Sequence, residues 1–284
     1  MDNINIKEDK YIVGIDIGGS TTKICGFKIE EKELIKPLYI KASDQVSSLY
    51  GAFGKFTSSN NISLNDIKEI QITGVGSTFI SEDIYGIPTK SVEEFKAIGM
   101  GGVYLSTLDS VIVVSMGTGT ALVKADKNGS TYLGGTGVGG GTIVGLSKLM
   151  LNMGDVDNVV KIAEKGNLRN IDLKIGDITK KDIIPGMPDY LTAANFGKIG
   201  DLTTKEDIAL GIFNLVFEAI GMTSILAARQ FGIEDIVLTG NLTRIIYCRK
   251  IFEALNDMFK VRFQIPEYAQ FGTAIGAALC CGEL

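Results

Sequence analysis

The stretch Val13-Gly-Ile-Asp-Ile-Gly-Gly-Ser-Thr-Thr-Lys23 decides the fold of this chain. Residues 11–15 form an apolar run of strand length, and extended character resumes at residues 24–28, after the glycine and hydroxyl residues. We therefore predict a strand, a tight turn and a second strand.

The turn has the residue types of a phosphate-binding loop. Glycines allow close backbone approach to a ligand, and hydroxyl groups with neighbouring N–H groups bind phosphate oxygens. The candidate phosphate-binding residues are Gly18, Gly19, Ser20, Thr21 and Lys23. Asp16, at the end of the first strand, can hold a magnesium ion directly or through water. The alternative is a plain hairpin turn whose aspartate forms a salt bridge.

The same device occurs again in the second half of the chain. Residues 110–115 are a continuous apolar strand that ends in Met116-Gly-Thr-Gly-Thr120, before the strand pattern resumes at 121–123. Asn128-Gly129 is a hairpin signal that returns the chain through residues 131–133. The offset of roughly a hundred residues indicates two similar lobes with a ligand in the cleft between them. Gly117, Thr118 and Gly119 are the second set of candidate phosphate-binding residues.

A third glycine run, residues 134–142, precedes an apolar helix that we expect from 143 to about 153. It satisfies a dinucleotide-binding pattern, but the strand before it returns from a hairpin and does not start a βαβ unit, so this interpretation is set aside. What remains is a glycine loop at a helix N-terminus, which suits an anion.

The remainder alternates helices and strands, which indicates an α/β protein. A long apolar helix is expected over 204–231, broken or frayed near Gly211 and Gly221. The strand at 236–241 ends in glycine. Ligand-binding groups gather at the carboxyl ends of strands in such sheets, which is where Asp16, Thr118 and Gly240 lie.

Composition restricts the possible partners. The chain has 284 residues, 45% of them hydrophobic, a net charge of -5 and no histidine. The absence of a basic field argues against nucleic acid or an anionic membrane as a partner, and the absence of histidine excludes a Ser-His-Asp triad. Residues 1–10 are polar and lack the apolar core of a signal peptide, so we expect a cytoplasmic protein without a membrane span.

The whole chain resembles the actin, heat-shock ATPase and sugar kinase superfamily, and within it the bacterial type II pantothenate kinases. The segments that carry the resemblance are 16–23, Val92-Glu-Glu94, 117–120, 134–141, Arg169-Asn-Ile-Asp-Leu-Lys174, Leu191-Thr-Ala-Ala-Asn-Phe-Gly197 and Phe271-Gly-Thr-Ala-Ile-Gly276. It implies a two-lobed actin-like ATPase fold of duplicated βββαβα units with a ligand cleft between the lobes. Residues 1–106 would form the N-terminal lobe, and 107–284 a C-terminal lobe with dimerisation helices.

The resemblance also implies a function. Type II pantothenate kinases are dimers that use ATP and Mg²⁺ to phosphorylate the primary hydroxyl of pantothenate, the first step of coenzyme A synthesis. Glu94 matches the family's catalytic carboxylate and Thr118 its small hydroxyl residue beside the substrate, while Lys23 would contact phosphates and Asp16 lie near magnesium. Gly139, Gly140 and Gly141 would flank the nucleotide. Alternatively, Glu94 completes a helix capping box with Ser91.

One position departs from the family. Just before the glycine loop the family usually has an arginine that contacts the substrate and the reacting phosphate, and this chain has Tyr132 there. A tyrosine supplies a hydrogen bond but no cation. Either a nearby group supplies the charge, or the acceptor is pantetheine or another small alcohol.

Two further functions remain open at this point. One is an ATPase switch similar to the activators of 2-hydroxyacyl-CoA dehydratases, whose cysteines bridge an iron–sulfur cluster; the adjacent Cys280 and Cys281 match that pattern poorly. The other is a regulatory paralogue that binds nucleotide or a coenzyme A precursor.

Overall fold

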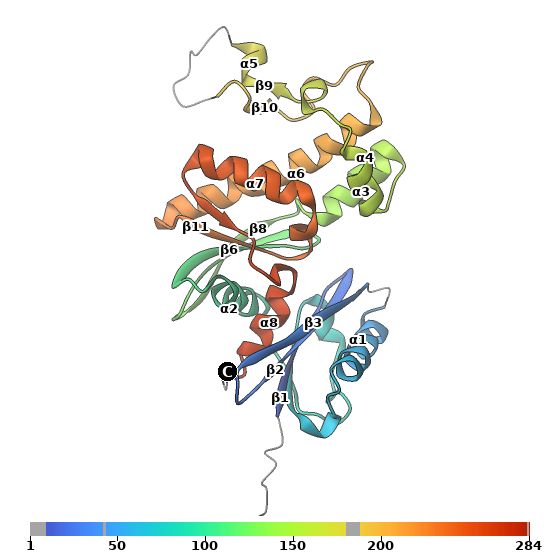
Figure 1. Cartoon of the computed structure of the whole chain (residues 1–284), viewed down its shortest axis with the longest axis vertical. Coiled ribbons are helices and arrows are strands. Elements are labelled where there is room, and N and C mark those ends of the chain that lie inside the picture. The colour runs from blue at the N-terminus through green and yellow to red at the C-terminus, as the bar shows by residue number, and fades with distance from the viewer. Residues whose placement is uncertain (1–9, 42–43, 180–187, 283) are drawn as a thin grey trace, which may run out of the picture.

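The computed structural model describes residues 10–41, 44–179, 188–282 and 284. The N-terminal segment that underlies the expected cytoplasmic location lies outside the described residues, apart from Lys10. Figure 1 shows an elongated molecule with one sheet at each side of a central helix, α8 (Gly272–Leu279), and a small extension at the end far from the first sheet.

The first sheet has five strands in the order β3-β2-β1-β4-β5. These are β1 (Tyr11–Ile17), β2 (Thr21–Lys28), β3 (Glu33–Lys41), β4 (Ile67–Thr73) and β5 (Thr89–Ser91). The first three form an antiparallel meander, and β4 and β5 add in parallel. The predicted strand, turn and strand at the start of the chain is therefore confirmed, with both strands longer than expected.

Two helices cover the two faces of this sheet, because successive side chains of a strand point to opposite faces. Val13, Ile15 and Ile17 pack with helix α1 (Gln45–Ser59) on one face. Ile12 packs with α8 on the other. A Cβ atom at Gly14 would lie 2.2 Å from the carbonyl oxygen of Ala274, so only glycine allows α8 to approach β1 this closely.

The second sheet repeats the order of the first, as β8-β7-β6-β11-β12. Its strands are β6 (Ser110–Met116), β7 (Thr120–Asp126), β8 (Gly129–Thr136), β11 (Asp235–Thr239) and β12 (Arg262–Gln264). Again an antiparallel meander of three strands is extended by parallel strands. The internal repeat predicted from the two glycine turns is confirmed.

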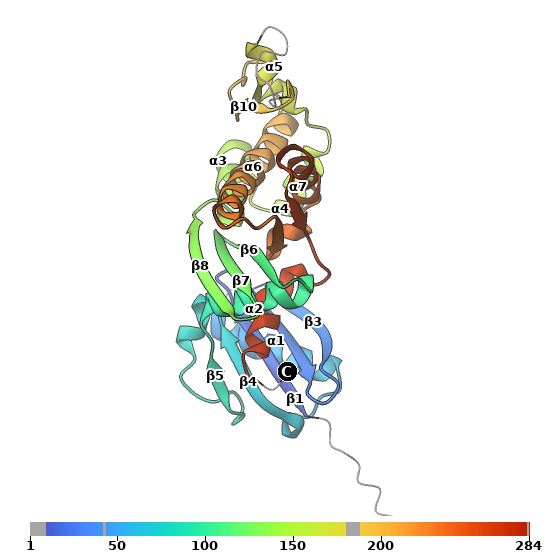
Figure 2. The same ribbon diagram turned by 90° about the vertical axis from the view of Figure 1, so that its left-hand side faces the viewer.

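Helices also cover both faces of the second sheet (Figure 2). On one face lie α3 (Gly140–Leu151), α4 (Val156–Ala163), α6 (Lys205–Phe231) and α7 (Ile246–Phe259), and on the other lies α2 (Glu94–Ser106). The helix α2 precedes the predicted lobe boundary at 106/107, yet it packs against the second sheet, whereas α8 packs against the first. The division into 1–106 and 107–284 stays a prediction, and these two helices cross it.

Helices α2 and α8, each of which packs against the sheet of the other lobe, contact each other through small residues. A Cβ atom at Gly276 of α8 would lie 1.8 Å from the carbonyl oxygen of Ala97 of α2, and one at Gly101 would lie 1.9 Å from the carbonyl oxygen of Gly272. Helix backbones can approach this closely only where a side chain is absent. The α2–α8 pair therefore joins the lobes as one packed unit.

The prediction that the long helix breaks near Gly211 and Gly221 is wrong, because α6 runs unbroken over 27 residues. A Cβ atom at Gly221 would lie 2.3 Å from Leu255 Cδ1, and one at Gly211 would lie 3.1 Å from Ile171 Cδ1. The glycines make room for neighbouring side chains, and that packing outweighs their low helix propensity. Although α6 is long and apolar enough to cross a membrane, 61% of its most apolar 18-residue window is buried inside the protein, as in a core helix.

The extension seen at one end of Figure 1 contains β9 (Leu173–Lys174), the short helix α5 (Ile175–Ile178) and β10 (Thr192–Ala194). Short 3-10 turns, η1 (Leu64–Asp66), η2 (Val75–Phe79), η3 (Leu168–Asn170), η4 (Asn241–Arg244) and η5 (Ala269–Phe271), complete the described elements.

Candidate functional site

A cavity of about 680 Å³ lies where the carboxyl ends of β1, β6 and β11 face one another. It brings together nearly all residues that the sequence singled out. They are Asp16, Gly18, Gly19, Ser20, Thr21, Lys23, Glu94, Gly117, Thr118, Gly119 and Tyr132. Residues from both sheets line it, so the expected cleft between the lobes is present.

At one wall of the cavity a buried ion pair joins β1 to β2. The strand register places Asp16 opposite Lys23 and beside Thr73, so these side chains leave the sheet on one face. Lys23 Nζ donates to Asp16 Oδ2 at 3.0 Å, and both side chains are less than one-tenth exposed. The salt-bridged aspartate considered as an alternative is present, within the turn that also lines the cavity.

Gly74 makes room for this carboxylate. It follows β4 with φ of +85°, a conformation that favours glycine, and a Cβ atom there would lie 2.7 Å from Asp16 Oδ1. No sequence signal distinguished Gly74 from the other glycines, because its role depends on a residue almost sixty positions earlier in the chain.

Both hairpin turns line the cavity with glycine and hydroxyl residues. In the first turn Gly18 N donates to the carbonyl oxygen of Thr21, which closes the loop. The N–H groups of Gly19 and Ser20 donate to no acceptor among the described residues. The second turn is closed in the same way, by Gly117 N donating to the carbonyl oxygen of Gly119 at 2.9 Å. Free N–H groups on a concave turn are suited to phosphate oxygens.

Gly139, Gly140 and Gly141 do not line the cavity, although Gly135, Thr136 and Gly137 of the same glycine run do. Their N–H groups are already used: Gly140 N donates to Gly117 O at 2.9 Å, and Gly141 N to Thr118 O at 2.8 Å. Gly139 N donates to Thr142 Oγ1 at 3.1 Å. The N-terminus of α3 therefore supports the second turn, and the expected place of these three glycines beside the nucleotide stays a prediction.

Glu94 faces the cavity from the first residue of α2. The predicted capping box of Ser91 and Glu94 is wrong, because the N-cap is Glu93, whose side chain accepts from the N–H groups of Phe95 and Lys96. The carboxylate of Glu94 has no hydrogen-bond partner within the described part of the chain. It remains available to a ligand.

The electrostatic environment of Glu94 favours its protonated form. Desolvation by burial is the largest cause that raises the pKa of this carboxyl, followed by the negative charges of Asp16 and Glu93, while Lys23 opposes the shift. A carboxylate with a raised pKa is a stronger base than an ordinary one, which is typical of a group that accepts a proton in a reaction.

Tyr132 is placed in the cavity by a stack and a bulge. Its ring stacks on Phe95, with centroids 3.9 Å apart and planes at 14°. The β7–β8 register shifts between Leu122 and Val123, and Gly134, with φ of +139°, lies opposite Leu122. Phe95 directly follows Glu94 in α2. The stack therefore joins β8, which carries Tyr132, to the start of α2, which carries the Glu94 carboxylate.

Two of the segments that carry the family resemblance, 169–174 and 191–197, lie in the extension and not in the cavity. They are held to α6 by a polar network: Asn214 Nδ2 donates to Asp172 Oδ2 at 2.8 Å, and Thr192 Oγ1 donates to Glu218 Oε1 at 2.7 Å. Phe196 N donates to the other oxygen of Asp172 at 2.9 Å. Within this chain these residues anchor the extension.

Among the described residues no group of three or more His, Cys, Asp or Glu side chains could hold a metal. Cys25 and Cys248 are buried, and Cys280 and Cys281 are half-buried. A magnesium ion commonly takes one or two carboxylates together with substrate phosphates, and the cavity offers Asp16 for that purpose.

Comparison with known proteins identifies the family and its relatives. The profile of the family named Fumble matches residues 50–256. The type II pantothenate kinase of Bacillus cereus is 31% identical over 239 residues, which cover 81% of this chain and 83% of that protein. The type II pantothenate kinase of Staphylococcus aureus (strain USA300) is 31% identical over 276 residues, covering 93% of this chain and 97% of that protein.

Among solved structures, the activator of the 2-hydroxyisocaproyl-CoA dehydratase from Clostridium difficile, with bound ADPNP, superposes with a TM-score of 0.68. The alignment covers 95% of this chain and 93% of that one, at 17% sequence identity. At this identity the likeness concerns the fold alone. The predicted actin-like ATPase fold is confirmed.

Proposed function

Because the chain belongs to the Fumble family and matches type II pantothenate kinases over most of its length, we propose that it transfers the γ-phosphate of ATP to the primary hydroxyl of pantothenate. The observation that carries the proposal is the position of Glu94. Its carboxylate is unpaired, has a raised pKa and faces the same cavity as the two hairpin turns.

Each part of the cavity has a role in this reaction. Phosphoryl transfer requires positioning and charge stabilisation more than covalent chemistry. The free N–H groups of the two turns and the ammonium of Lys23 bind the phosphates of ATP. Asp16 would hold Mg²⁺, and the bound ion would neutralise phosphate charge. Glu94 accepts the proton of the acceptor hydroxyl as its oxygen bonds to the γ-phosphorus and the bond to ADP breaks.

The acceptor lies beside Thr118 and Tyr132. Both side chains line the cavity, and a hydroxyl group can donate to or accept from the polar groups of pantothenate. Lys23 is already paired with Asp16, so no unpaired cation among the described cavity residues replaces the family's arginine. The Thr118 and Tyr132 side chains therefore form the acceptor wall, and the stack on Phe95 holds the Tyr132 ring in place.

The homology also underlies three finer proposals: that the enzyme uses magnesium, works in the cytoplasm and is a homodimer through helices of its second lobe. Exposed apolar side chains on those helices, Leu149 of α3 at 82% and Leu226 of α6 at 62%, support the last. Light scattering of the purified protein gives its mass in solution directly.

The function is tested by measuring ADP release from magnesium-ATP, first with no acceptor and then with pantothenate or pantetheine, with the phosphorylated product identified by mass. We expect turnover that depends on pantothenate and a mass gain of one phosphoryl group. ADP release that is the same with and without acceptor would contradict the proposal.

A further inference from the structure

Asn241 lines the cavity and follows Gly240, but it is not one of the candidate site residues that the sequence indicated. It is the first residue of η4, directly after β11. Its Nδ2 donates to Thr21 Oγ1 at 3.0 Å, across 220 positions of sequence. This bond joins the second lobe to the first phosphate-binding turn.

The donor side of this bond is fixed to the second sheet. Gly240 has φ of +90°, and a Cβ atom there would lie 2.4 Å from the carbonyl oxygen of Met116, so the chain turns tightly against the end of β6. Gly240 N also donates to Ala269 O at 3.0 Å, and Leu242 is buried. Asn241 therefore has little freedom to follow a moving partner.

The acceptor side is the hydroxyl of a residue in the first turn. A threonine hydroxyl has one proton to donate and two lone pairs to accept with. Because Asn241 donates to this oxygen, one lone pair is occupied and the proton is directed to another acceptor. The nearest open space is the cavity, where the phosphates of a nucleotide would lie. A donated hydrogen bond also polarises a hydroxyl and makes it a better donor.

We infer that Asn241 is a positioning residue for nucleotide binding: it fixes the rotation of the Thr21 hydroxyl so that its proton points to a phosphate oxygen. The inference rests on the proposed function, since it assigns a nucleoside di- or triphosphate to the cavity. Asn241 acts through Thr21 and need not touch the nucleotide.

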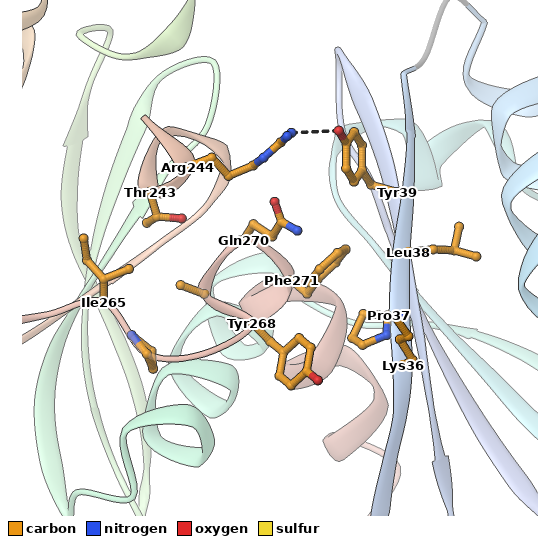
Figure 3. Close-up of a pocket in the computed structure, with 12 residues that line it drawn as sticks. Lys36, Pro37, Leu38, Tyr39, Thr243, Arg244, Ile265, Tyr268, Gln270 and Phe271 are labelled. Atoms are coloured by element: carbon orange, nitrogen blue, oxygen red, sulfur yellow. Dashed lines mark hydrogen bonds between the residues drawn. The ribbon is translucent and has the colours of Figure 1, made fainter. Parts of the chain in front are cut away.

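The same 3-10 turn supplies a matched control. Arg244, the last residue of η4, donates from Nη1 to the hydroxyl of Tyr39 on β3 at 2.8 Å. Figure 3 shows this bond spanning a second cavity, of about 580 Å³, whose lining shares no residue with the cavity that holds Thr21. Tyr39→Phe removes one bond between the lobes without touching the phosphate-binding turn.

The test is the affinity for ADP in the presence of Mg²⁺, measured by titration calorimetry without any acceptor. We expect Asn241→Ala to weaken binding by about tenfold, the upper range for one hydrogen bond. Asn241→Asp should weaken it further, because a carboxylate accepts the Thr21 proton and repels phosphate. Tyr39→Phe should leave the affinity within about twofold, and melting temperatures show whether each variant is folded.

A double-mutant cycle isolates the coupling. Thr21→Val should weaken binding at least as much as Asn241→Ala, and the double variant should bind no worse than Thr21→Val alone. Additive losses, equal losses for Tyr39→Phe and Asn241→Ala, or unchanged binding in Asn241→Ala would each overturn the inference and leave the proposed function in place. Failure of the unchanged protein to bind ADP would overturn both.

Discussion

The carboxylate of Asp16 and the ammonium of Lys23 lie 3.0 Å apart on neighbouring strands, buried at the wall of the proposed nucleotide site. The pair is both a structural contact and a part of that site. Removing one member leaves the other charge buried without a counter-ion, which costs more than the pair contributes.

For Asp16→Asn we therefore expect a loss of about 3–5 kcal/mol in the free energy of unfolding, together with the loss of magnesium-dependent phosphoryl transfer. Chemical denaturation measures the first effect. The exposed pair of Arg249 and Glu253, at 4.0 Å, is the control, and Glu253→Gln should cost less than about 1 kcal/mol. Equal costs for the two variants would show that the Asp16 pair is not buried as described.

Glu94→Gln tests the proposed base. The amide keeps the shape of the side chain but cannot accept the hydroxyl proton, so we expect kcat to fall about a hundredfold or more. Nucleotide affinity should be largely retained, because the phosphate-binding turns are unchanged. Glu93→Gln, at the helix cap next to it, is the matched control. Turnover that survives in Glu94→Gln would remove this residue from the mechanism.

The raised pKa of Glu94 has consequences for activity and stability that run in opposite directions. The base must be ionised, so kcat should decline as pH falls through a pKa above that of an ordinary glutamate. Stability changes the other way: the folded state holds this proton more tightly than the unfolded state, so ionisation of Glu94 destabilises the fold as pH rises above its unfolded pKa.

Thermal unfolding checks the second consequence. Glu94→Gln should melt at a higher temperature than the unchanged protein at neutral pH, and the difference should shrink in acid, where both carry a neutral side chain. A variant less stable at neutral pH would mean that the carboxylate has a favourable partner in the fold.

Gly74→Ala should damage both the site and the fold. Gly74 has φ of +85° and ψ of 166°, a conformation essentially restricted to glycine, so alanine there is strained by about 1–3 kcal/mol. The added Cβ atom would also lie 2.7 Å from Asp16 Oδ1, which displaces the carboxylate from Lys23. Gly86 has a similar φ of +75° with nothing within 4 Å of a Cβ atom, so Gly86→Ala carries the strain alone. We expect both variants to melt at a lower temperature than the unchanged protein, with the larger decrease and the loss of kinase activity in Gly74→Ala.

Tyr132 is expected to affect the acceptor and not the nucleotide. Tyr132→Ala removes both the hydroxyl and the stack on Phe95, and should raise KM for pantothenate about tenfold with little change in KM for ATP. Tyr132→Phe keeps the stack, so a smaller rise is expected. Tyr190→Ala, at an exposed tyrosine in the extension, is the control. A larger change in KM for ATP would place Tyr132 in the nucleotide site.

Much of this architecture could be predicted because it is local. Apolar runs and glycine turns indicated the meander of each lobe, and the offset between Asp16-Ile-Gly-Gly and Met116-Gly-Thr-Gly indicated their repetition. The errors arise where a local preference is overridden by a distant neighbour. A helix break was predicted at Gly221 because glycine has a low helix propensity. The residue that makes glycine favourable there, Leu255, lies in another helix and could not be linked to it from the sequence.

In the candidate site, too, local features could be predicted from the sequence and contacts between distant residues could not. Residues in the two hairpin turns were identified because a turn and its ligand groups are contiguous in sequence. Asn241 and Gly74 were missed because each acts on one atom of a residue far away, Thr21 and Asp16 respectively. The sequence also could not show that two N–H groups of the third glycine run, those of Gly140 and Gly141, donate to the carbonyls of Gly117 and Thr118.

The packing of α8 on β1 bears on how the chain is made. Synthesis proceeds from the N-terminus, so β1, β2 and β4 leave the ribosome well before the helix that covers them. Until residues 272–279 emerge, Ile12 and Phe27 lack the α8 side chains that complete their cluster on that face of the sheet. We infer that one apolar face of the nascent first lobe stays incompletely covered, and prone to association, through most of translation. Helix α8 covers this face only after the rest of the second lobe has been synthesised.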